Sequence, residues 1–299
     1  MLPTDPTSTV ACSVTVPIVA HQPIAESMWR LRLDCPTLAA AARPGQFAMV
    51  RIPHRHDPLL ARPLAVYDTF GSLAEPTSWQ RQTAGAAGGP LRYADFVYSV
   101  AGKFTTAATA LRPGDELTLW GPLGNGFSLP PATQLVLVAG GIGQTALLML
   151  GRAWLAANPG CRATFCWGGR DGRVFGHVED FEQAGLAVNL ATLDGSAGTR
   201  GTVVDLLDTL ETRDGFAAGT KTAIACCGPE GMLAAVAGWA AERGIGCQVS
   251  LETPMACGVG ICFSCVAPIR DAAGGWDYRR TCIEGPVFEA AAVAWDALD

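Results

Sequence analysis

Four cysteines in the last fifth of the chain have the spacing of a metal centre. Cys257, Cys262 and Cys265 form a C-x4-C-x2-C run, and Cys282 follows after sixteen further residues. Plant-type [2Fe–2S] clusters use this spacing, with three thiolates on one short loop and a fourth from elsewhere in the chain. The two glycines inside the run can take backbone angles closed to other residues, so that amide groups approach the cluster. The pattern predicts a [2Fe–2S] cluster on these cysteines.

Other uses of the four cysteines stay open at this point. Zinc binds four thiolates equally well, although structural zinc sites usually pair two short C-x2–4-C units. A disulfide is disfavoured in the cytosol, and four unrelated buried cysteines would not need the intervening glycines. The gap before Cys282 is shorter than in plant ferredoxins, so the segment is not a plant ferredoxin domain as such.

Two glycine-containing loops follow apolar runs that predict buried strands. Glycines at such a turn let the phosphates of a dinucleotide approach a helix N-terminus, where unpaired amide groups favour negative charge. One such loop is as often only a tight packing turn, but a second one at the same edge of a sheet strengthens the nucleotide interpretation. The candidate residues are Gly140, Gly141 and Gly143 of the first loop and Cys227, Gly228 and Pro229 of the second.

The run RPLAVY at 62–67 combines a cation, a rigid backbone and an aromatic ring. An arginine can bind a pyrophosphate, exposed backbone amides can contact a ring edge and a tyrosine can stack, which together suit a flavin. Taken alone, an ordinary strand with a solvated arginine explains the same run. The flavin interpretation therefore depends on what surrounds this run in the chain.

The order of elements predicts a small antiparallel barrel followed by an α/β domain. Short runs rich in β-branched and aromatic residues predict the barrel, and apolar strands alternating with helices predict a parallel sheet covered on both faces. A long surface loop is expected at 71–92. The expected barrel strands are 13–19, 28–33, 46–52, 62–68, 95–100 and 116–120. The expected α/β elements are strands at 134–139, 163–167, 186–193, 222–226 and 247–251 and helices at 146–157, 178–184, 203–210 and 232–243.

Composition argues against several classes of function. The formal net charge is −6 and no cluster of Lys and Arg occurs, which argues against nucleic-acid binding. No apolar run has membrane-spanning length, and no secretory signal is evident, so we expect a cytoplasmic protein with no membrane partner. No nucleophile motif such as G-x-S-x-G is present, and no catalytic residue is predicted.

The order of these features resembles the ferredoxin–NADP reductase superfamily. Within it, the chain resembles the electron-transfer subunits of type B dihydroorotate dehydrogenase almost from end to end. The segment 252–288 is the most specific, and GPLGNGF at 121–127 is the next. The matching runs are ARPLAVYD, VYSVAGKFT, LRPGDELTLWGPLGNGF, LVLVAGGIG, GTVVDLL, CCGPEGML, ETPMACGVGICFSC and TCIEGPVF.

The resemblance implies FAD, one [2Fe–2S] cluster and NAD as co-substrate. It implies an FAD-binding β-barrel over 1–130, an NAD-binding α/β domain over 131–246 and a small cluster-binding subdomain over 247–299, with the four cysteines as cluster ligands. By position, the residues expected to contact the flavin are Arg62, Pro63, Leu64, Ala65, Val97, Tyr98, Ser99, Phe104 and Thr105.

Some positions depart from the family pattern. The family usually has Ser where Ala65 stands, so a hydroxyl near the flavin ring is missing, and it usually has Arg where Ser99 stands, so a cation is missing. It usually has Gly where Phe104 stands, and this ring is expected to crowd the pyrophosphate. Gln144 and Thr145 stand where small residues and prolines are usual. These departures bear on the flavin and nicotinamide rather than on the cluster.

The resemblance also implies a reaction and a partner. Dihydroorotate would reduce FMN in a separate catalytic subunit, and electrons would cross the cluster to FAD in this chain and leave on NAD, in de novo pyrimidine (UMP) biosynthesis. An assembly with two of each chain is expected. A nicotinamide moves hydride, an iron–sulfur cluster moves single electrons and a flavin does both, so the expected order in space is cluster, FAD, NAD.

Two other functions remain as alternatives. The chain could be the small subunit of another NAD(P)H-dependent iron–sulfur flavoprotein reductase, of the sulfide dehydrogenase or transhydrogenase type. It could also be a non-enzymatic redox-sensing or zinc-stabilised binding protein. Arg170 and Arg173 follow the strand at 163–167 and could bind the 2′-phosphate of NADP, although surface arginines explain them equally and the resemblance favours NAD.

Overall fold

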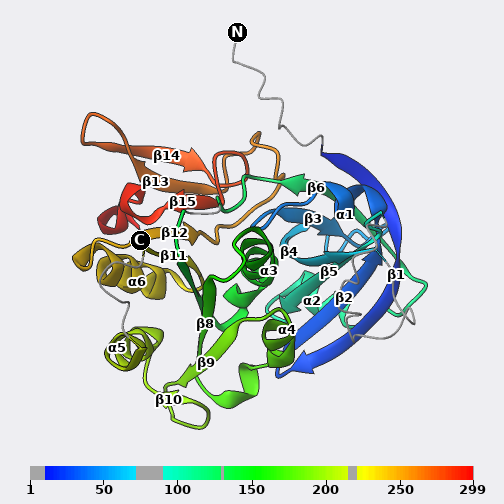
Figure 1. Cartoon of the computed structure of the whole chain (residues 1–299). Coiled ribbons are helices and arrows are strands. Elements are labelled where there is room, and N and C mark those ends of the chain that lie inside the picture. The colour runs from blue at the N-terminus through cyan, green and yellow to red at the C-terminus, as the bar shows by residue number, and fades with distance from the viewer. Residues whose placement is uncertain (1–10, 72–89, 129–130, 215–220, 299) are drawn as a thin grey trace.

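The computed structural model describes residues 11–71, 90–128, 131–214 and 221–298, and its first part is a closed six-stranded barrel (Figure 1). Around the barrel the strands follow the order β1-β2-β5-β4-β3-β6, and every neighbouring pair is antiparallel. The elements are β1 Cys12–Ala25, β2 Met28–Asp34, α1 Pro36–Ala41, β3 Phe47–Arg51, β4 Arg62–Phe70, β5 Tyr93–Ser99, α2 Lys103–Ala108 and β6 Glu116–Leu123.

Strand β1 closes the barrel because its two ends pair with different strands. The first part of β1 pairs with β6 and the second with β2. Alternation of side chains then sends Val16, Leu31 and Phe96 into the barrel core. Arg30 and Arg32 alternate with the core residues of β2 and point outward, yet both are buried. The rest of the molecule therefore covers this outer face of the barrel.

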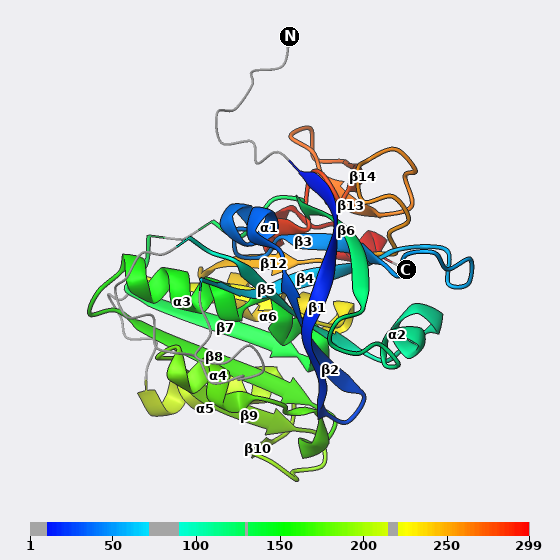
Figure 2. The ribbon, with the colours of Figure 1, turned by 90° about the vertical axis from the view of Figure 1, so that its right-hand side faces the viewer.

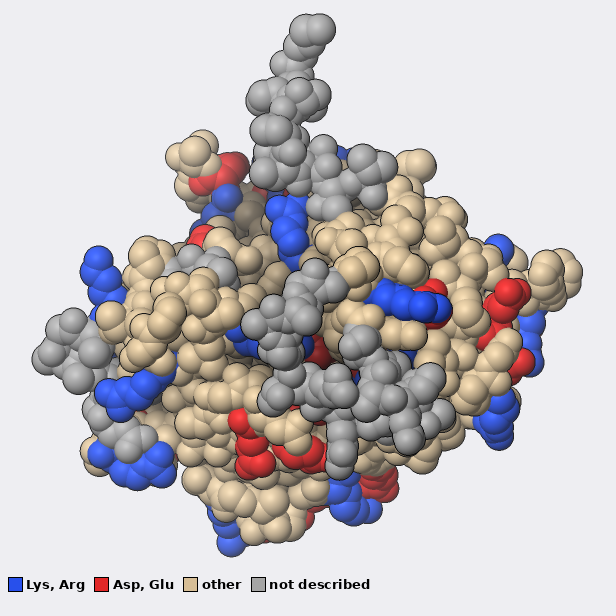
Figure 3. Space-filling model, turned by 45° about the vertical axis from the view of Figure 1, so that its right-hand side comes forward, with Lys and Arg blue, Asp and Glu red and all other residues tan. Residues whose placement is uncertain are grey.

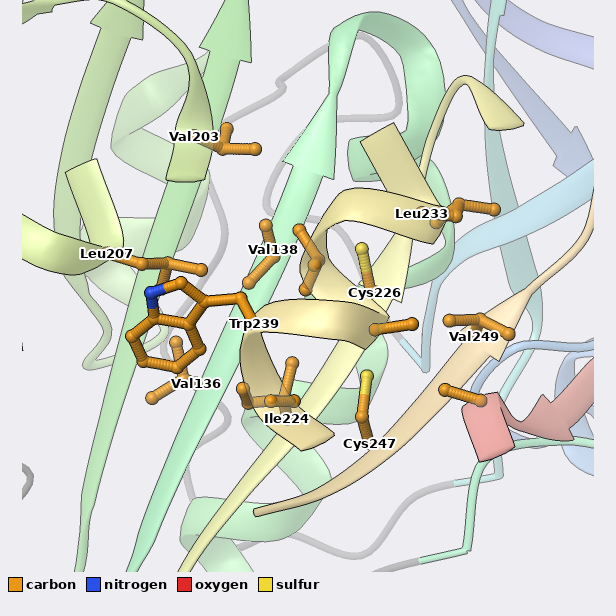
Figure 4. Packing of buried hydrophobic residues seen from close by; sticks show 14 of the residues in the cluster. Val136, Val138, Val203, Leu207, Ile224, Cys226, Leu233, Trp239, Cys247 and Val249 are labelled. Carbon is orange, nitrogen blue, oxygen red and sulfur yellow. The ribbon is translucent and has the colours of Figure 1, made fainter. Parts of the chain in front are cut away.

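That covering part, the α/β half, is built on a seven-stranded sheet in the order β10-β9-β8-β7-β11-β12-β15. The strands are parallel except β15, which pairs antiparallel with β12 at one edge. Leu135 and Leu137 of β7 face α3, α4 and the barrel, whereas Val136 and Val138 face α5 and α6 (Figure 4). The elements are β7 Gln134–Gly140, α3 Leu148–Ala157, β8 Arg162–Gly169, α4 Val178–Gln183, β9 Ala187–Thr192, β10 Thr199–Arg200, α5 Val203–Asp214, β11 Thr222–Cys227, α6 Glu230–Glu242 and β12 Gly246–Ser250.

The C-terminal segment returns to both parts of the molecule. After the cysteine loop, β13 (Val266–Arg270) and β14 (Trp276–Arg280) form a two-stranded hairpin, and β15 (Val287–Glu289) then joins the edge of the main sheet. In both ribbon views this segment lies beside the end of the barrel that carries β3 and β6 (Figure 2). The residue boundaries of the three domains stay a prediction.

The predicted fold class is confirmed: the six barrel strands, the parallel strands and the helices of the α/β half all form. The helix expected from about Ala146 begins at Leu148, because residues 141–146 form a 3₁₀ helix. Gly143 packs so closely on the carbonyl of Cys227 that a Cβ would overlap it, so only glycine fits at this position of the turn. The sequence analysis missed α1, α2, β10 and the strands after the cysteine loop.

Most of the loop expected at 71–92 lies outside the described residues. Within the described residues, no helix is both long enough and apolar enough to cross a membrane.

Candidate functional site

The four candidate cluster ligands come together as two pairs of thiols. The thiols of Cys257 and Cys262 are in hydrogen-bonding contact, and so are those of Cys265 and Cys282. The first pair lies toward the surface, with Cys262 exposed, and the second pair is buried. The spacing in the sequence therefore corresponds to one compact group of four sulfur atoms with an outer and an inner side.

This pairing fits a binuclear cluster. A [2Fe–2S] cluster with four cysteines takes two thiolates on each iron, which two pairs of thiols can supply. A zinc site needs four ligands converging on one ion. Within the described ranges, no three His, Cys, Asp or Glu side chains are grouped in a way that could hold a single metal ion. The two pairs of thiols are therefore the observation that fits the cluster.

The backbone of the cysteine loop is shaped to bring amide groups to the sulfurs. Gly258 and Gly260 have φ of 72° and 79°, a region that favours glycine. A Cβ on Gly258 would overlap the side chain of Met49 in β3. The N–H of Val259 donates to Cys257 Sγ at 3.4 Å, and that of Gly260 donates to the sulfur of Cys282. Hydrogen bonds from backbone amides stabilise thiolate ligands and tune the reduction potential of a cluster.

The outer and inner thiols differ in their acidity. Hydrogen bonds from the Ser264 hydroxyl and backbone, and then from Cys257, lower the pKa of Cys262 to about 6. Burial and then the contact with Cys265 raise the pKa of Cys282 to about 12. Because thiolates are the metal-binding form, the Cys282 thiol needs a bound cation to be deprotonated, whereas the Cys262 thiol is already close to that state.

The cysteine loop is docked on the barrel. Cys265 and Cys282 pack in a small apolar cluster with Met49 of β3 and Ala61, the residue directly before β4. Trp120 Nε1 of β6 donates to the carbonyl of Cys257 at 3.0 Å. The run GPLGNGF makes a second attachment through an asparagine.

Asn125 in that run binds the segment after Cys282. Its backbone N–H donates to Gly285 O at 2.7 Å, and its side-chain amide donates to Glu284 O at 3.0 Å. The Val287 N–H donates back to Asn125 Oδ1 at 3.2 Å. The side chain of Asn125 therefore forms hydrogen bonds to backbone groups, as a neighbouring strand would, and it fixes the cluster segment to the barrel.

Strands β4 and β5 stop pairing with each other at one end, and we call the two unpaired strand edges there the slot. Their ladder ends at the pair Val66–Phe96. Beyond it, β4 continues to pair with β3 as far as Arg62, and β5 continues to pair with β2 as far as Ser99. The backbone edges of 62–65 and 97–99 thus face each other without ladder hydrogen bonds. Seven of the nine flavin candidates lie on these two edges.

The side chains of the flavin candidates differ in what they can offer. Arg62 is partly exposed and donates to the carbonyl of the preceding residue at 3.0 Å. The Tyr98 hydroxyl and His21 Nε2 are 2.8 Å apart, and Thr105 Oγ1 accepts backbone N–H bonds at the start of α2. The Phe104 ring is buried in the barrel core, so it offers no surface that would crowd a pyrophosphate.

A cavity of about 990 Å³ opens between the barrel and the carboxyl edge of the sheet. Gly140, Gly141 and Pro229 of the predicted nucleotide loops line it, and so do Ser99 and Met28 of the barrel. The size and the position at the ends of parallel strands suit a nucleotide. Ser99 belongs to both the slot and the cavity wall, which makes the two spaces neighbours.

The other three nucleotide candidates lie behind the cavity wall. A Cβ on Gly143 would overlap the Cys227 carbonyl, and a Cβ on Gly228 would come within 2.8 Å of Gly140 N. Gly228 has a φ of 155°. Gly143, Cys227 and Gly228 therefore pack the two loops against each other, while the adjoining Ile142 and Pro229 reach the cavity.

Sequence analysis missed two acidic residues on the cavity wall. Asp171 accepts hydrogen bonds from Arg173 at 2.8 Å and 3.0 Å, and Glu26 of the barrel forms a second ion pair with Arg173 at 3.2 Å. The hydrogen bonds from Arg173 lower the pKa of Asp171 to about 2. The sequence signal that could have found Asp171 is its position two residues after the second strand of the α/β half, where nucleotide-binding folds often place an acid.

A second missed feature is a group of buried charges between the barrel and the α/β half. Arg30, Arg32 and Asp95 of the barrel and Asp180 of α4 are all almost fully buried and hydrogen-bonded to one another. Charged residues that alternate with leucines in a predicted strand were the available signal. In the face drawn in Figure 3, by contrast, Lys and Arg are scattered among Asp and Glu and form no basic stripe.

The fold defines the class of protein. A chain in a solved structure of an NADH-dependent reduced ferredoxin–NADP oxidoreductase is 28% identical, with a TM-score of 0.75 over 95% of this chain and 91% of that one. A ferredoxin reductase of carbazole 1,9a-dioxygenase shares the fold at 20% identity and a TM-score of 0.60, over 79% and 67% of the two chains. By its fold, the chain is a reductase of the ferredoxin–NADP reductase class.

Sequence comparison gives the particular family. Residues 252–294 match the model of the iron–sulfur cluster binding domain of dihydroorotate dehydrogenase B. The electron transfer subunit of dihydroorotate dehydrogenase B (NAD(+)) from Desulforamulus reducens is 34% identical over 93% of this chain and 97% of its own length. The corresponding subunit from Geobacillus sp. is 32% identical over 92% and 96%. The chain belongs to the family of dihydroorotate dehydrogenase B electron-transfer subunits.

The family predicted from the sequence is therefore confirmed, as is an oxidoreductase subunit that works with a separate catalytic subunit. The individual contact residues stay predictions. The geometry brings the four cysteines, the two slot edges and part of the glycine loops into one connected region of the molecule.

Proposed function

We propose that this chain passes electrons between a dihydroorotate-oxidising subunit and NAD through a [2Fe–2S] cluster and FAD, in de novo pyrimidine biosynthesis. The observation that carries the proposal is the position of the slot. Ala61, which packs with the two buried cysteines, directly precedes Arg62 at the slot edge, and Ser99 on the opposite edge lines the cavity. This arrangement supports the order cluster, FAD, NAD.

The residues of the slot and cavity have separate tasks in this proposal. A flavin supplies the link between hydride and single-electron transfer. The facing backbone edges at 62–65 and 97–99 hold the flavin ring, and the Arg62 guanidinium binds the pyrophosphate. Gly140, Gly141 and Pro229 hold the nicotinamide nucleotide at the sheet edge. Ala65 contributes no hydroxyl, so backbone groups carry the polar contacts on its strand.

The charges on the cavity wall support NAD over NADP. Arg173 is the cation that could attract a 2′-phosphate, but Asp171 and Glu26 both neutralise it. A carboxylate in this place accepts a hydrogen bond from a ribose hydroxyl and repels a phosphate. Arg170 lines the same cavity. The neighbouring Asp171 carboxylate offsets its positive charge, which weakens its attraction for a 2′-phosphate.

The surface around the outer cysteines supports a docking site for the catalytic partner, which we take to be the FMN-containing subunit. Val259, Ile261, Phe263 and Ile283 are exposed there, at 79% for Ile261 and 62% for Phe263. Phe263 has a φ of 58°, and the Arg280 guanidinium lies 4.7 Å from its ring centre. Exposed apolar side chains that surround a redox centre are typical of a protein interface.

Two further parts of the proposal concern the assembly. Two copies of each chain are expected in the complex, and the location is the cytoplasm. All eleven cysteines lie in the described ranges, and none of them forms a disulfide there.

Anaerobic purification of the chain with its co-expressed partner tests the function. We expect one FAD with iron and acid-labile sulfide in the holoprotein, bleaching of the flavin by NADH, and NADH formation when dihydroorotate and NAD are added to the complex. A flavin- and iron-containing complex that forms no NADH from dihydroorotate would disprove the assignment of the partner. A colourless zinc protein would disprove electron transfer altogether.

A second candidate function is favoured by one comparison. The similarity to a chain of NADH-dependent reduced ferredoxin–NADP oxidoreductase extends over 95% of this chain. The small subunit of another NAD(P)H-dependent iron–sulfur flavoprotein reductase would have the same cofactors and a different partner. Identification of the subunit that co-purifies from the native source separates the two candidates.

A further inference from the structure

Four buried charges lie between the barrel and the α/β half. Arg30 of β2 donates to Asp95 Oδ2 at 2.8 Å and 2.6 Å and to Asp180 Oδ2 at 2.8 Å. Arg32 donates to both oxygens of Asp95 at 2.8 Å and 2.9 Å. The ion-paired side chains are at most 4% exposed. Three of these residues belong to the barrel and Asp180 belongs to α4, so the group joins the two parts of the molecule.

This buried group lies at the closed end of the flavin slot. The Tyr67 hydroxyl donates to Asp180 Oδ2 at 2.8 Å, and Tyr67 directly follows Val66, where the β4–β5 ladder ends. Arg30 is the register partner of Val97, which is on the slot edge. Asp180 is therefore held by two barrel residues whose positions are fixed by the same strands that form the slot.

A continuous chain of contacts leads from Asp180 to the glycine loop of the cavity. The adjacent Phe181 ring stacks on Phe165 with centroids 4.0 Å apart, and it lies 5.9 Å from Trp167. The Trp167 indole N–H donates to the carbonyl of Gly141 at 2.9 Å. Gly141 lines the cavity. A movement of α4 relative to the barrel would therefore move the loop that holds the nucleotide relative to the slot.

Buried ion pairs hold their partners in one arrangement, because no water is present to replace a lost partner. Burial alone would lower the pKa of Arg30, but the Asp95 and Asp180 carboxylates outweigh it and raise the pKa above the usual value. The neighbouring core of aromatic rings is close-packed and transmits displacement rather than absorbing it. The group of buried charges is thus suited to fixing the position of α4 relative to the barrel.

We propose that Arg30, Tyr67 and Asp180 position the nicotinamide against the flavin without touching either. The Asp180 carboxylate is hydrogen-bonded to Arg30 and Tyr67, and these bonds fix the position of α4 on the barrel. The contacts of Phe181 with Trp167, and of Trp167 with the Gly141 carbonyl, make the position of the glycine loop depend on that of α4. The inference rests on the proposed function, since it concerns hydride transfer between the two sites.

The test uses the holoprotein with Tyr67→Phe and Asp180→Asn. Tyr67→Phe removes one hydroxyl and keeps the ring, so it is expected to fold and to bind FAD. The limiting rate of flavin reduction by NADH, measured by stopped-flow absorbance, should fall about 10- to 100-fold, since small misplacements have costs of that size. The dissociation constant for NADH should change less than about twofold, because its contacts within the α/β half are retained.

A matched control separates positioning from stability. Leu210 of α5 is buried in the core cluster on the other side of the sheet and does not line the cavity. Leu210→Ala should lower the thermal midpoint at least as much as Tyr67→Phe and leave the limiting rate unchanged. Asp180→Glu keeps the charge but adds a methylene, and its rate should stay below that of the unaltered protein.

The outcomes are distinct. Equal limiting rates for the unaltered protein, Tyr67→Phe and Asp180→Asn would overturn the positioning role, whatever their stabilities. An Asp180→Glu variant at the full rate would show that charge alone matters and would also overturn it. A protein that binds no FAD, or whose flavin NADH does not reduce, would instead refute the proposed function. The cluster absorption of all variants should match that of the unaltered protein.

Discussion

The cysteine loop takes three of its four ligands from nine consecutive residues, whereas the nucleotide cavity takes its walls from both halves of the molecule. The loop is shaped by its own backbone, through the positive φ angles of Gly258 and Gly260 and through hydrogen bonds from backbone amides to sulfur. The cavity is shaped by long-range contacts, including a buried charge on α4 that is held by the barrel. The cysteine loop is thus a local site surrounded by exposed apolar side chains, whereas the nucleotide cavity is formed by distant parts of the chain that ion pairs hold together.

Because the two sites are built from different parts of the chain, we expect that damage to the single-electron site leaves the hydride site working, and the reverse. Damage to the loop should remove cluster chemistry and leave the reaction of NADH with flavin. Damage to the contacts between the halves should slow hydride transfer and leave the cluster intact. The following experiments test that separation in order of decreasing expected effect.

Cys262→Ser should have the largest effect. The exposed thiol has a pKa lowered to about 6, so it is poised to be an iron ligand, and a serine oxygen is a poor replacement. The visible and electron paramagnetic resonance signals of the cluster should vanish, while anaerobic FAD reduction by NADH keeps its rate. Equal loss of both activities would show that the cysteines support the whole chain and that the two sites are not separable.

Gly258→Ala should have the next largest effect. A methyl group there would overlap Met49 and would have to accept a φ of 72°, so the loop must shift on the barrel. We expect cluster content to fall by more than about tenfold and the free energy of unfolding to fall by about 1–3 kcal/mol. Gly238→Ala is the control, because this glycine lies within α6 with open space around it. That substitution should add about 0.5–1 kcal/mol of stability, and a loss of cluster there would contradict the steric argument.

The same contrast explains what could be predicted from the sequence. The four cysteines and the two glycine loops were recognisable because their spacing is short and their chemistry is carried by residue type. The six barrel strands followed from alternation and turn residues, and all six formed. Local patterns with a fixed period or spacing therefore transfer from sequence to structure.

The missed features share a different origin. Asp180 pairs with Arg30 across 150 residues, and a barrel strand that carries Arg30 and Arg32 gives no hint of what neutralises them. Asn125 lies in a run that matched the family, but nothing in the sequence indicated its contacts with Gly285 and Val287. These contacts arise only when separate parts of the chain pack, so a single sequence does not reveal them.

Ile261→Glu tests whether the loop surface is a partner interface. A carboxylate in the centre of an apolar contact stays partly desolvated on binding, which weakens association. We expect dihydroorotate-dependent NADH formation at limiting partner concentration to fall about tenfold, with FAD and cluster contents unchanged. Leu91→Glu, at another exposed apolar residue, should have little effect. Unaltered activity and binding in Ile261→Glu would remove this surface from consideration.

Asp171→Asn tests the distributed site by changing its charge. The substitution keeps the Glu26 ion pair of Arg173 and removes the carboxylate that would repel a 2′-phosphate. We expect kcat/KM for NADPH to rise about tenfold relative to NADH, measured as flavin or dye reduction, with the cluster spectra unchanged. Glu26→Gln should give a smaller change in the same direction. No gain in NADPH use would mean that the preference is set elsewhere.

His21→Gln should have the smallest effect, and it concerns the flavin side alone. The Leu111 carbonyl can only accept, so the Nδ1 of His21 carries the proton, and neutral Nε2 then accepts from the Tyr98 hydroxyl. Burial, more than the opposing bond to Leu111, lowers the pKa of His21 below its usual 6.5. The unfolded chain therefore binds a proton more readily than the folded protein in this range.

It follows that this histidine lowers stability as the pH falls below about 6.5, the ordinary histidine value. Urea unfolding of the barrel at pH 7.5 and at pH 6 should show a loss on acidification that His21→Gln reduces. Because Tyr98 is on the slot edge, FAD retention should follow the same pH trend, whereas cluster absorption over this range should not depend on residue 21. A cluster signal that tracked His21 would show that the two sites are coupled through the barrel, against the separation argued from their construction.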